Sequence, residues 1–171
     1  MDWYFTAFEL IDLRSFSNLW FWIMLAVFWS TASHFVLGVP FDLVVRAQSD
    51  DMQAKQDLAD MVRIQTNRLL FIVETSGTWL IGFIFFFLSS LIILGFIYDV
   101  EFAQALFLLG APMSLVLTLS IRSARKIRLE EGDAIYRRLK KHRFLIQVIG
   151  MLSIFVTSMW GMYINVTVGV L

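Results

Sequence analysis

Four long runs of apolar residues, separated by polar segments, make up most of this 171-residue chain. A helix needs about 20 mostly apolar residues to cross a bilayer, and each run reaches that length. The runs lack the strict alternation of strands, so they predict helices. We therefore expect an all-α, polytopic membrane protein with four transmembrane helices, at residues 19–39, 69–98, 102–121 and 144–168.

The two longest polar segments, residues 41–68 and 122–143, also carry helical patterns. From Gln48 to Arg68 there is no Pro or Gly, so we expect a helix that continues directly into the second apolar run. Residues 122–143 should extend the third run, turn near Gly132 and lead into the fourth run. Together these segments predict a short helical collar at one face of the membrane.

The first 16 residues predict a short helix that lies at the membrane interface. Tyr4, Phe8 and Ile11 fall on one helical face, as in interfacial amphipathic helices. The segment is not expected to be a signal peptide, because Asp2 opens it and no positive charge precedes Arg14.

The composition fits a membrane protein and carries no signature of catalysis. Hydrophobic residues make up 58% of the chain and charged residues 16%, against about 25% charged residues in soluble domains. The absence of Cys excludes disulfides, thiolate metal sites and cysteine nucleophiles. No phosphate-binding loop, dinucleotide fingerprint, zinc motif or serine elbow occurs in the sequence. We expect a protein that is not an enzyme and that has no cofactor or metal.

The positive charges define an orientation. Of the 14 Lys and Arg residues, one precedes the first run, four lie between the first and second, and nine lie between the third and fourth. Positively charged loops stay in the cytoplasm. This predicts a protein of the bacterial inner membrane with its N-terminus and its C-terminus in the periplasm.

Most of the basic residues between the third and fourth runs form one candidate contact surface. They are expected to touch anionic lipid head groups; an acidic protein partner is the alternative, and nucleic acid is not expected because aromatic interleaving is missing. The members are Arg125, Lys126, Arg128, Arg137, Arg138, Lys140, Lys141 and Arg143.

Two ionisable residues within the runs, His34 and Glu74, are candidates for function because charged groups are costly in hydrocarbon. Glu74 is either a protonation site for ion-coupled transport or a structural partner of Arg122 or Gln147. His34 is either a metal ligand or proton relay, or a packed histidine bonded to a carbonyl or to Glu74.

The helical face that contains Glu74 continues through Thr78, Gly82, Phe85 and Ser89, and is rich in small residues. We expect this face to point into protein. A second strip of small residues, at helical spacing in the fourth run, is a candidate for helix packing. It permits either packing within the chain or contact between copies, and its members are Gly150, Ser153, Thr157 and Gly161.

Three segments, residues 8–20, 100–105 and 147–155, resemble a family of small bacterial inner-membrane proteins that are sometimes labelled as components of the iron–sulfur assembly (Suf) complex. The similarity spans the chain. It implies a location in the bacterial inner membrane and carries no catalytic motif to transfer.

These observations predict a non-enzymatic integral membrane protein that acts as a structural or accessory subunit. Its expected partners are membrane lipids and either copies of itself or other membrane-protein subunits. The alternative is a small channel or ion-coupled transporter that uses Glu74 and His34. A continuous polar stripe through several runs would favour a pore, but the outer halves contain only scattered polar residues.

Overall fold

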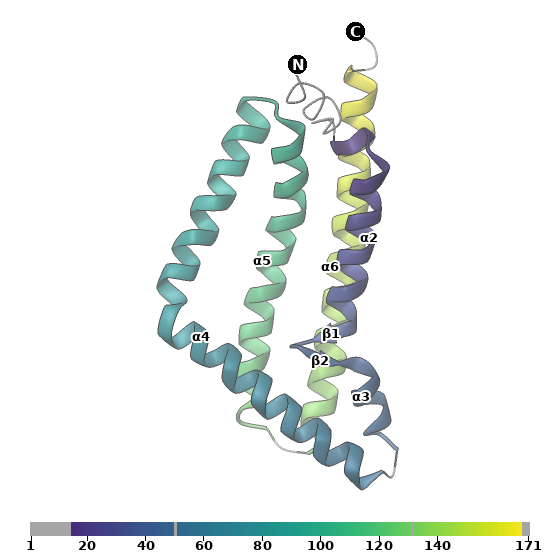
Figure 1. The fold of residues 1–171 in the computed structure, drawn as a ribbon, viewed down its shortest axis with the longest axis vertical. Coiled ribbons are helices and arrows are strands. Elements are labelled where there is room, and N and C mark those ends of the chain that lie inside the picture. The colour runs from purple at the N-terminus through teal and green to yellow at the C-terminus, as the bar shows by residue number, and fades with distance from the viewer. Residues whose placement is uncertain (1–14, 50, 131, 169–171) are drawn as a thin grey trace, which may run out of the picture.

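The computed structural model describes residues 15–49, 51–130 and 132–168, which form a bundle of long helices (Figure 1). The predicted interfacial helix falls almost wholly on residues 1–14 and so lies outside the described residues. The elements, in chain order, are η1 (Ser15–Ser17), α2 (Leu19–His34), β1 (Phe35–Val36), β2 (Val39–Pro40), α3 (Phe41–Arg46), α4 (Met52–Ile92), the π-helix η2 (Ile93–Ile97), α5 (Glu101–Ile127) and α6 (Asp133–Val168).

Three segments of the described chain are long and apolar enough to cross a membrane: Met52–Ile97, Glu101–Ile127 and Ala134–Thr167. The fourth apolar helix, α2, has only 16 residues. At 1.5 Å per residue it is about 24 Å long, shorter than the ~30 Å hydrocarbon core of a bilayer. The architecture is therefore that of a predominantly helical membrane protein with three long apolar helices.

The long helices stand in a row, with α4 packed on α5, α5 on α6 and α6 on α2 (Figure 1). α2 and α4 are at the two ends of this row. α2 runs antiparallel to α6, because Trp22 approaches Gly161 whereas Trp29, further along α2, approaches Gly150. The two inner helices, α5 and α6, are the scaffold on which the others pack.

The first apolar run is not helical along its whole length, which corrects the expectation of a helix to residue 39. α2 ends at His34, and β1 and β2 then form an antiparallel hairpin in which Val36 pairs with Val39. The two turn residues, Leu37 and Gly38, have φ values of 55° and 78°. A two-residue hairpin turn with both φ values positive matches the twist of its strands. The hairpin therefore replaces the last turn of the predicted helix.

α4 is one helix of 41 residues, so the predicted helix before the second apolar run does continue into it. It is bent: its first part crosses beneath α5 and α6, and its second part runs beside α5 (Figure 1). The first part buries every fourth residue against the rest of the chain: Ala54, Leu58, Val62, Thr66 and Leu70.

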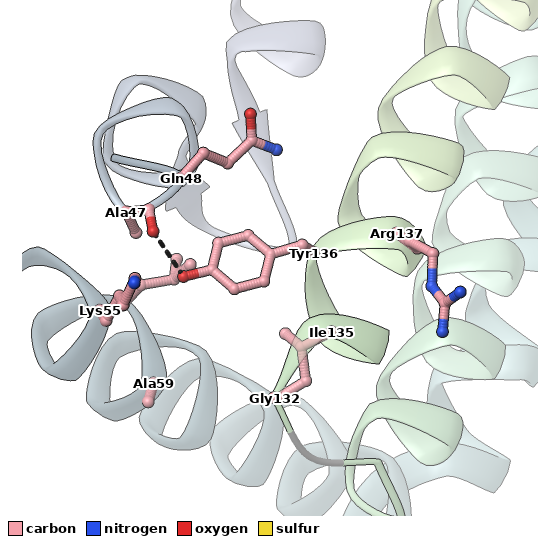
Figure 2. A pocket seen from close by; sticks show the side chains of 9 residues that line it. Ala47, Gln48, Lys55, Ala59, Gly132, Ile135, Tyr136 and Arg137 are labelled. Atoms are coloured by element: carbon pink, nitrogen blue, oxygen red, sulfur yellow. Dashed lines mark hydrogen bonds between the residues drawn. The ribbon is translucent and has the colours of Figure 1, made fainter. Parts of the chain in front are cut away.

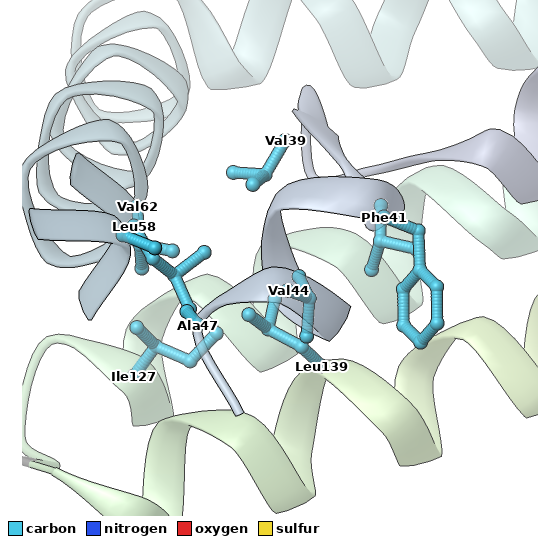
Figure 3. Close-up of a cluster of buried hydrophobic side chains, with 10 residues drawn as sticks. Val39, Phe41, Val44, Ala47, Leu58, Val62, Ile127 and Leu139 are labelled. Atoms are coloured by element: carbon cyan, nitrogen blue, oxygen red, sulfur yellow. The ribbon is translucent and has the colours of Figure 1, made fainter. Parts of the chain in front are cut away.

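The collar, formed by the hairpin, α3, the first part of α4 and the adjoining ends of α5 and α6, has its own apolar core (Figure 3). Val39 and Val44 come from the hairpin and α3, Leu58 from α4, Ile127 from α5 and Leu139 from α6. All five side chains are buried. Complete burial of such a side chain contributes roughly 1.5–3 kcal/mol, so this cluster holds the first part of α4 beneath the bundle.

We predict that Leu58→Ala lowers the free energy of unfolding by about 2–5 kcal/mol, because it leaves a cavity in the collar core. Leu58 is only 2% exposed. The matched control is Leu129→Ala, since Leu129 is 87% exposed and the same truncation should have little effect there. Thermal unfolding of the purified protein in detergent measures both. Equal melting temperatures for the two variants would contradict a packed collar.

Candidate functional site

The four polar residues predicted to form an intramembrane site, His34, Glu74, Arg122 and Gln147, are all exposed. Among the described residues, no hydrogen bond or ion pair joins any two of them. The structure therefore does not assemble these four residues into one site, and each has its own surroundings.

Glu74 pairs with Arg128 instead of the predicted Arg122 or Gln147. The Arg128 Nη1 atom lies 3.4 Å from Glu74 Oε1, and both side chains are more than half exposed. The reason is the path of α4, which crosses the end of α5 (Figure 1) and brings Glu74 beside the residue that caps that helix. Exposed ion pairs contribute at most about 1 kcal/mol, so this pair orients the two side chains without dominating stability.

His34 is the last residue of α2, and its side chain is exposed. Its ring meets the Phe35 ring edge-on, with 4.9 Å between the ring centres. It is not the packed histidine of one prediction, because the chain leaves the helix at this residue and turns into the hairpin.

The buried histidine of the described chain is His142 on α6, which is 1% exposed. Its Nε2 atom lies 3.1 Å from the Ser120 Oγ atom, and its Nδ1 atom lies 3.1 Å from the Ser123 Oγ atom. The Ser120 hydroxyl donates to the Val116 carbonyl at 2.8 Å. Because a hydroxyl has one proton, this geometry assigns the neutral ring proton to Nε2, which donates to Ser120, while Nδ1 accepts from Ser123.

Sequence reasoning missed His142, which lies among basic residues, although its position in the helical repeat of α6 indicates that it is buried. The small-residue strip of the fourth run, extended towards the collar at the same helical spacing, reaches Ile146, His142 and Leu139, all of which are buried. A serine and a histidine in contact also occur in hydrolases. Here, however, the histidine ring is buried, and among the described residues no carboxylate orients it.

We predict that His142→Leu costs about 1–3 kcal/mol of stability, because the two serine hydroxyls lose a buried partner. His34→Leu is the matched control, since the same replacement at an exposed ring removes no such bond. The melting temperatures of the two variants in detergent decide the question. Equal values would show that the bonds between α5 and α6 at this histidine do not stabilise the fold.

The two glycines in the strip of small residues on α6 lie against η1 and α2 of the same chain. A side-chain carbon added at Gly150 would come within 2.8 Å of the Trp29 ring, and one added at Gly161 would come within 3.1 Å of Phe16. Ser153 and Thr157, between the two glycines, are buried. Small residues permit close approach of helices in membranes, and here the close approach is between α6 and α2 with η1.

We predict that Gly150→Ala destabilises the protein by about 1–3 kcal/mol, because the added methyl group overpacks the contact with Trp29. Gly82→Ala on α4 is the control, since within the described ranges no atom lies within 4 Å of the position of its added carbon. Thermal unfolding distinguishes the two. If Gly150→Ala were as stable as Gly82→Ala, the tight contact between α2 and α6 would be absent.

The predicted basic surface lies on the collar. Six of its eight residues are exposed: Arg125, Lys126, Arg128, Arg137, Lys140 and Lys141. The other two are engaged: Arg138 bonds to Glu130, and the Arg143 guanidinium lies 3.8 Å above the Phe41 ring centre. The hydrogen bond from Arg138 lowers the pKa of the Glu130 carboxyl. The collar thus presents many cations and uses two of them to fasten its own elements.

A hollow of about 670 Å³ lies in the collar between α3, α4 and α6 (Figure 2). The Tyr136 hydroxyl donates to the Ala47 carbonyl at 2.9 Å across it, and Lys55 and Arg137 are at its wall. In Figure 2 the Arg137 guanidinium points away from Tyr136. The hollow contains none of the four predicted intramembrane residues.

The face of α4 that was expected to point into protein is exposed on this chain. Thr75, Thr78, Gly82 and Ser89 share the side of the helix opposite α5, flanked by exposed aromatic rings. The reason is that α5 is the long helix against which α4 mainly packs, so the far side of the second part of α4 has no neighbour among the described residues. We call this surface the outer face of α4; its aromatic members are Phe71, Trp79, Phe85 and Phe86.

Comparisons of the chain with protein-family models, with curated proteins and with solved structures return no match.

Proposed function

We propose that this chain is a non-enzymatic integral membrane protein that acts as a structural or accessory subunit, either of an oligomer of itself or of a larger membrane complex. It spans the bacterial inner membrane four times and has both termini in the periplasm. The observation that carries the proposal is the outer face of α4, which combines small residues, hydroxyl groups and large aromatic rings on a surface that the described part of the chain leaves uncovered.

The fourth crossing in this proposal is α2 together with the hairpin. Along α6, the contacts of the first segment run from Gly161, beside Trp22, to Arg143, which lies over Phe41. These two α6 residues are 18 positions apart, which corresponds to about 27 Å of helix. That distance is close to the ~30 Å hydrocarbon core, so α2, the hairpin and the start of α3 together cover a length of α6 close to the thickness of that core.

The orientation follows from the charges. Thirteen of the 14 Lys and Arg residues lie in the two segments between the first and second and between the third and fourth apolar runs, and those that the structure describes are at the collar end. The positive-inside rule assigns this end to the cytoplasm. The resemblance to small bacterial inner-membrane proteins supports the choice of membrane.

The outer face of α4 is suited to a protein partner more than to lipid alone. Helices in lipid associate where small residues let their backbones approach, and hydroxyl groups bond across the contact. Thr78 and Gly82 are four residues apart and so are neighbours on one side of α4, where a partner helix can approach closely. The small-residue strip of α6, by contrast, already packs within the chain, so α4 is the better surface for contact between subunits.

We predict that Gly82→Leu lowers the population of the oligomer or complex at least fivefold, because its side chain separates the helices that meet there. The fold should be retained, since no atom of the described residues lies within 4 Å of the added carbon. Gly77→Leu, five residues away on the opposite side of α4, is the matched control. Native mass measurement in mild detergent gives both populations. Loss of assembly in both variants, or in neither, would contradict a subunit contact at this face.

The alternative, an ion-coupled transporter or channel, is tested by flux. We expect proton and cation flux into liposomes that contain the protein to equal that into protein-free liposomes. Flux that disappears in Glu74→Gln, a variant without the carboxylate charge, and remains in Asp60→Gln, a control at an exposed acid, would favour the alternative.

A further inference from the structure

Two hollows lie end to end along the contact between α4 and α5. The one nearer the collar has a volume of about 360 Å³ and the other about 260 Å³. Met113 and Leu117 of α5 line both of them, so the two hollows meet at these side chains. We call the combined feature the α4–α5 groove.

The groove is polar at one end and apolar at the other. At the collar end the residues that line it include Arg68, Gln65 and Ser120, which have polar side chains. At the far end the wall consists of Phe83, Phe87 and their apolar neighbours. The hydroxyl at that end, on Ser114, donates to the Ala111 carbonyl at 2.7 Å and so has its acceptor within α5.

The length of the groove matches one leaflet of a bilayer. Ser120 lines its collar end and Gly110 lines its far end. These residues are ten positions apart on α5, which is about 15 Å of helix. Half of the ~30 Å hydrocarbon core is the same distance, so the groove extends from the level of the basic collar towards the middle of the membrane.

The hairpin borders the polar end with non-helical backbone. Leu37, whose φ is 55°, and Gly38 line the groove there. A left-handed conformation is uncommon for Leu and points to a local constraint. A carbon added at Gly38 would lie 3.2 Å from the Gln65 amide oxygen, so the turn and this side chain are in close contact. Irregular backbone within an apolar run is tolerated where it lines a cavity.

We propose that the α4–α5 groove binds one anionic phospholipid of the leaflet on the collar side. Its phosphate lies at Arg68, where a guanidinium can form paired hydrogen bonds to phosphate oxygens, and the Gln65 amide supplies a further donor. One acyl chain follows Met113 and Leu117 towards Phe83. Arg68 is exposed and has no partner among the described residues, so the guanidinium is accessible from the head-group layer.

The charge and the shape of the groove together select this ligand. A zwitterionic lipid fits the apolar part but brings a competing ammonium group to Arg68. Free phosphate fits the polar part but leaves the apolar part empty. The site goes beyond the proposed subunit role and is lined by other residues than those of the outer face of α4, so one proposal can fail without the other.

The test is native mass spectrometry of the delipidated full chain with phosphatidylglycerol or phosphatidylcholine added at equal concentration. We expect one phosphatidylglycerol per chain, bound at least tenfold more tightly than phosphatidylcholine. Arg68→Gln should abolish this preference, because a charge-assisted contact accounts for about a tenfold difference or more. The matched control is Arg122→Gln, an exposed arginine that does not line the groove, and its preference should equal that of the unmodified protein.

A second variant tests the apolar part. Met113→Trp fills the junction of the two hollows and should lower binding of both lipids at least fivefold, whereas Met151→Trp, at a position that is 63% exposed on α6, should not. Melting temperatures identify any variant that fails to fold. If Met113→Trp fails to fold, Gly110→Leu replaces it and fills the far end of the groove. Equal binding of the two lipids, or unchanged binding in Arg68→Gln and in the filled variants, overturns the proposal. So does displacement of the bound lipid by inorganic phosphate alone, which would indicate a head-group site without a chain.

Discussion

The exclusion of charge from hydrocarbon is the constraint on which the rest of this structure depends. Charged side chains and unpaired backbone groups are costly at membrane depth, and this chain gathers nearly all of its cations into two segments that meet at one end of the bundle. These segments become helices and a hairpin, and their apolar residues pack into a separate core beneath the spans. The collar is thus a consequence of charge placement, and its core fixes the first part of α4 across the ends of α5 and α6.

The small residues of the chain lie in two strips that have different surroundings. On α6 they admit the aromatic side chains of the first segment, with Gly150 against Trp29 and Gly161 against Phe16. On α4 they lie on the side away from α5, around Gly82, where the part of the chain that the structure describes supplies no partner. Two strips with similar composition therefore have different roles: one holds the chain together, and the other is the surface that we assign to a neighbouring subunit.

Much of the helical architecture could be predicted from the apolar runs, because their length and lack of alternation indicate helices directly. The hairpin could not, since Phe35 and Val36 are as apolar as the helix before them, and Gly38 and Pro40 indicate an interruption of the helix but not the strands on either side of the turn. The partner of Glu74 was missed because it depends on the bend of α4, which places Glu74 beside Arg128. No Pro in α4 indicates this bend. His142 follows the buried spacing of α6 but is hidden among Lys and Arg. The exposure of Gly82 depends on which helices pack against α4. The sequence pattern of a single helix does not determine its neighbours.

The most direct test of the account is the side of the membrane on which each end of the bundle lies. Because the chain has no Cys, single cysteines at Ser17, Tyr98 and Leu129 can be labelled with an impermeant maleimide in intact cells and in inverted vesicles. The four-span account predicts that positions 17 and 98 react from the periplasmic side and position 129 from the cytoplasmic side. Reaction of position 17 from the same side as position 129 would show that the first segment does not cross, and would contradict the account.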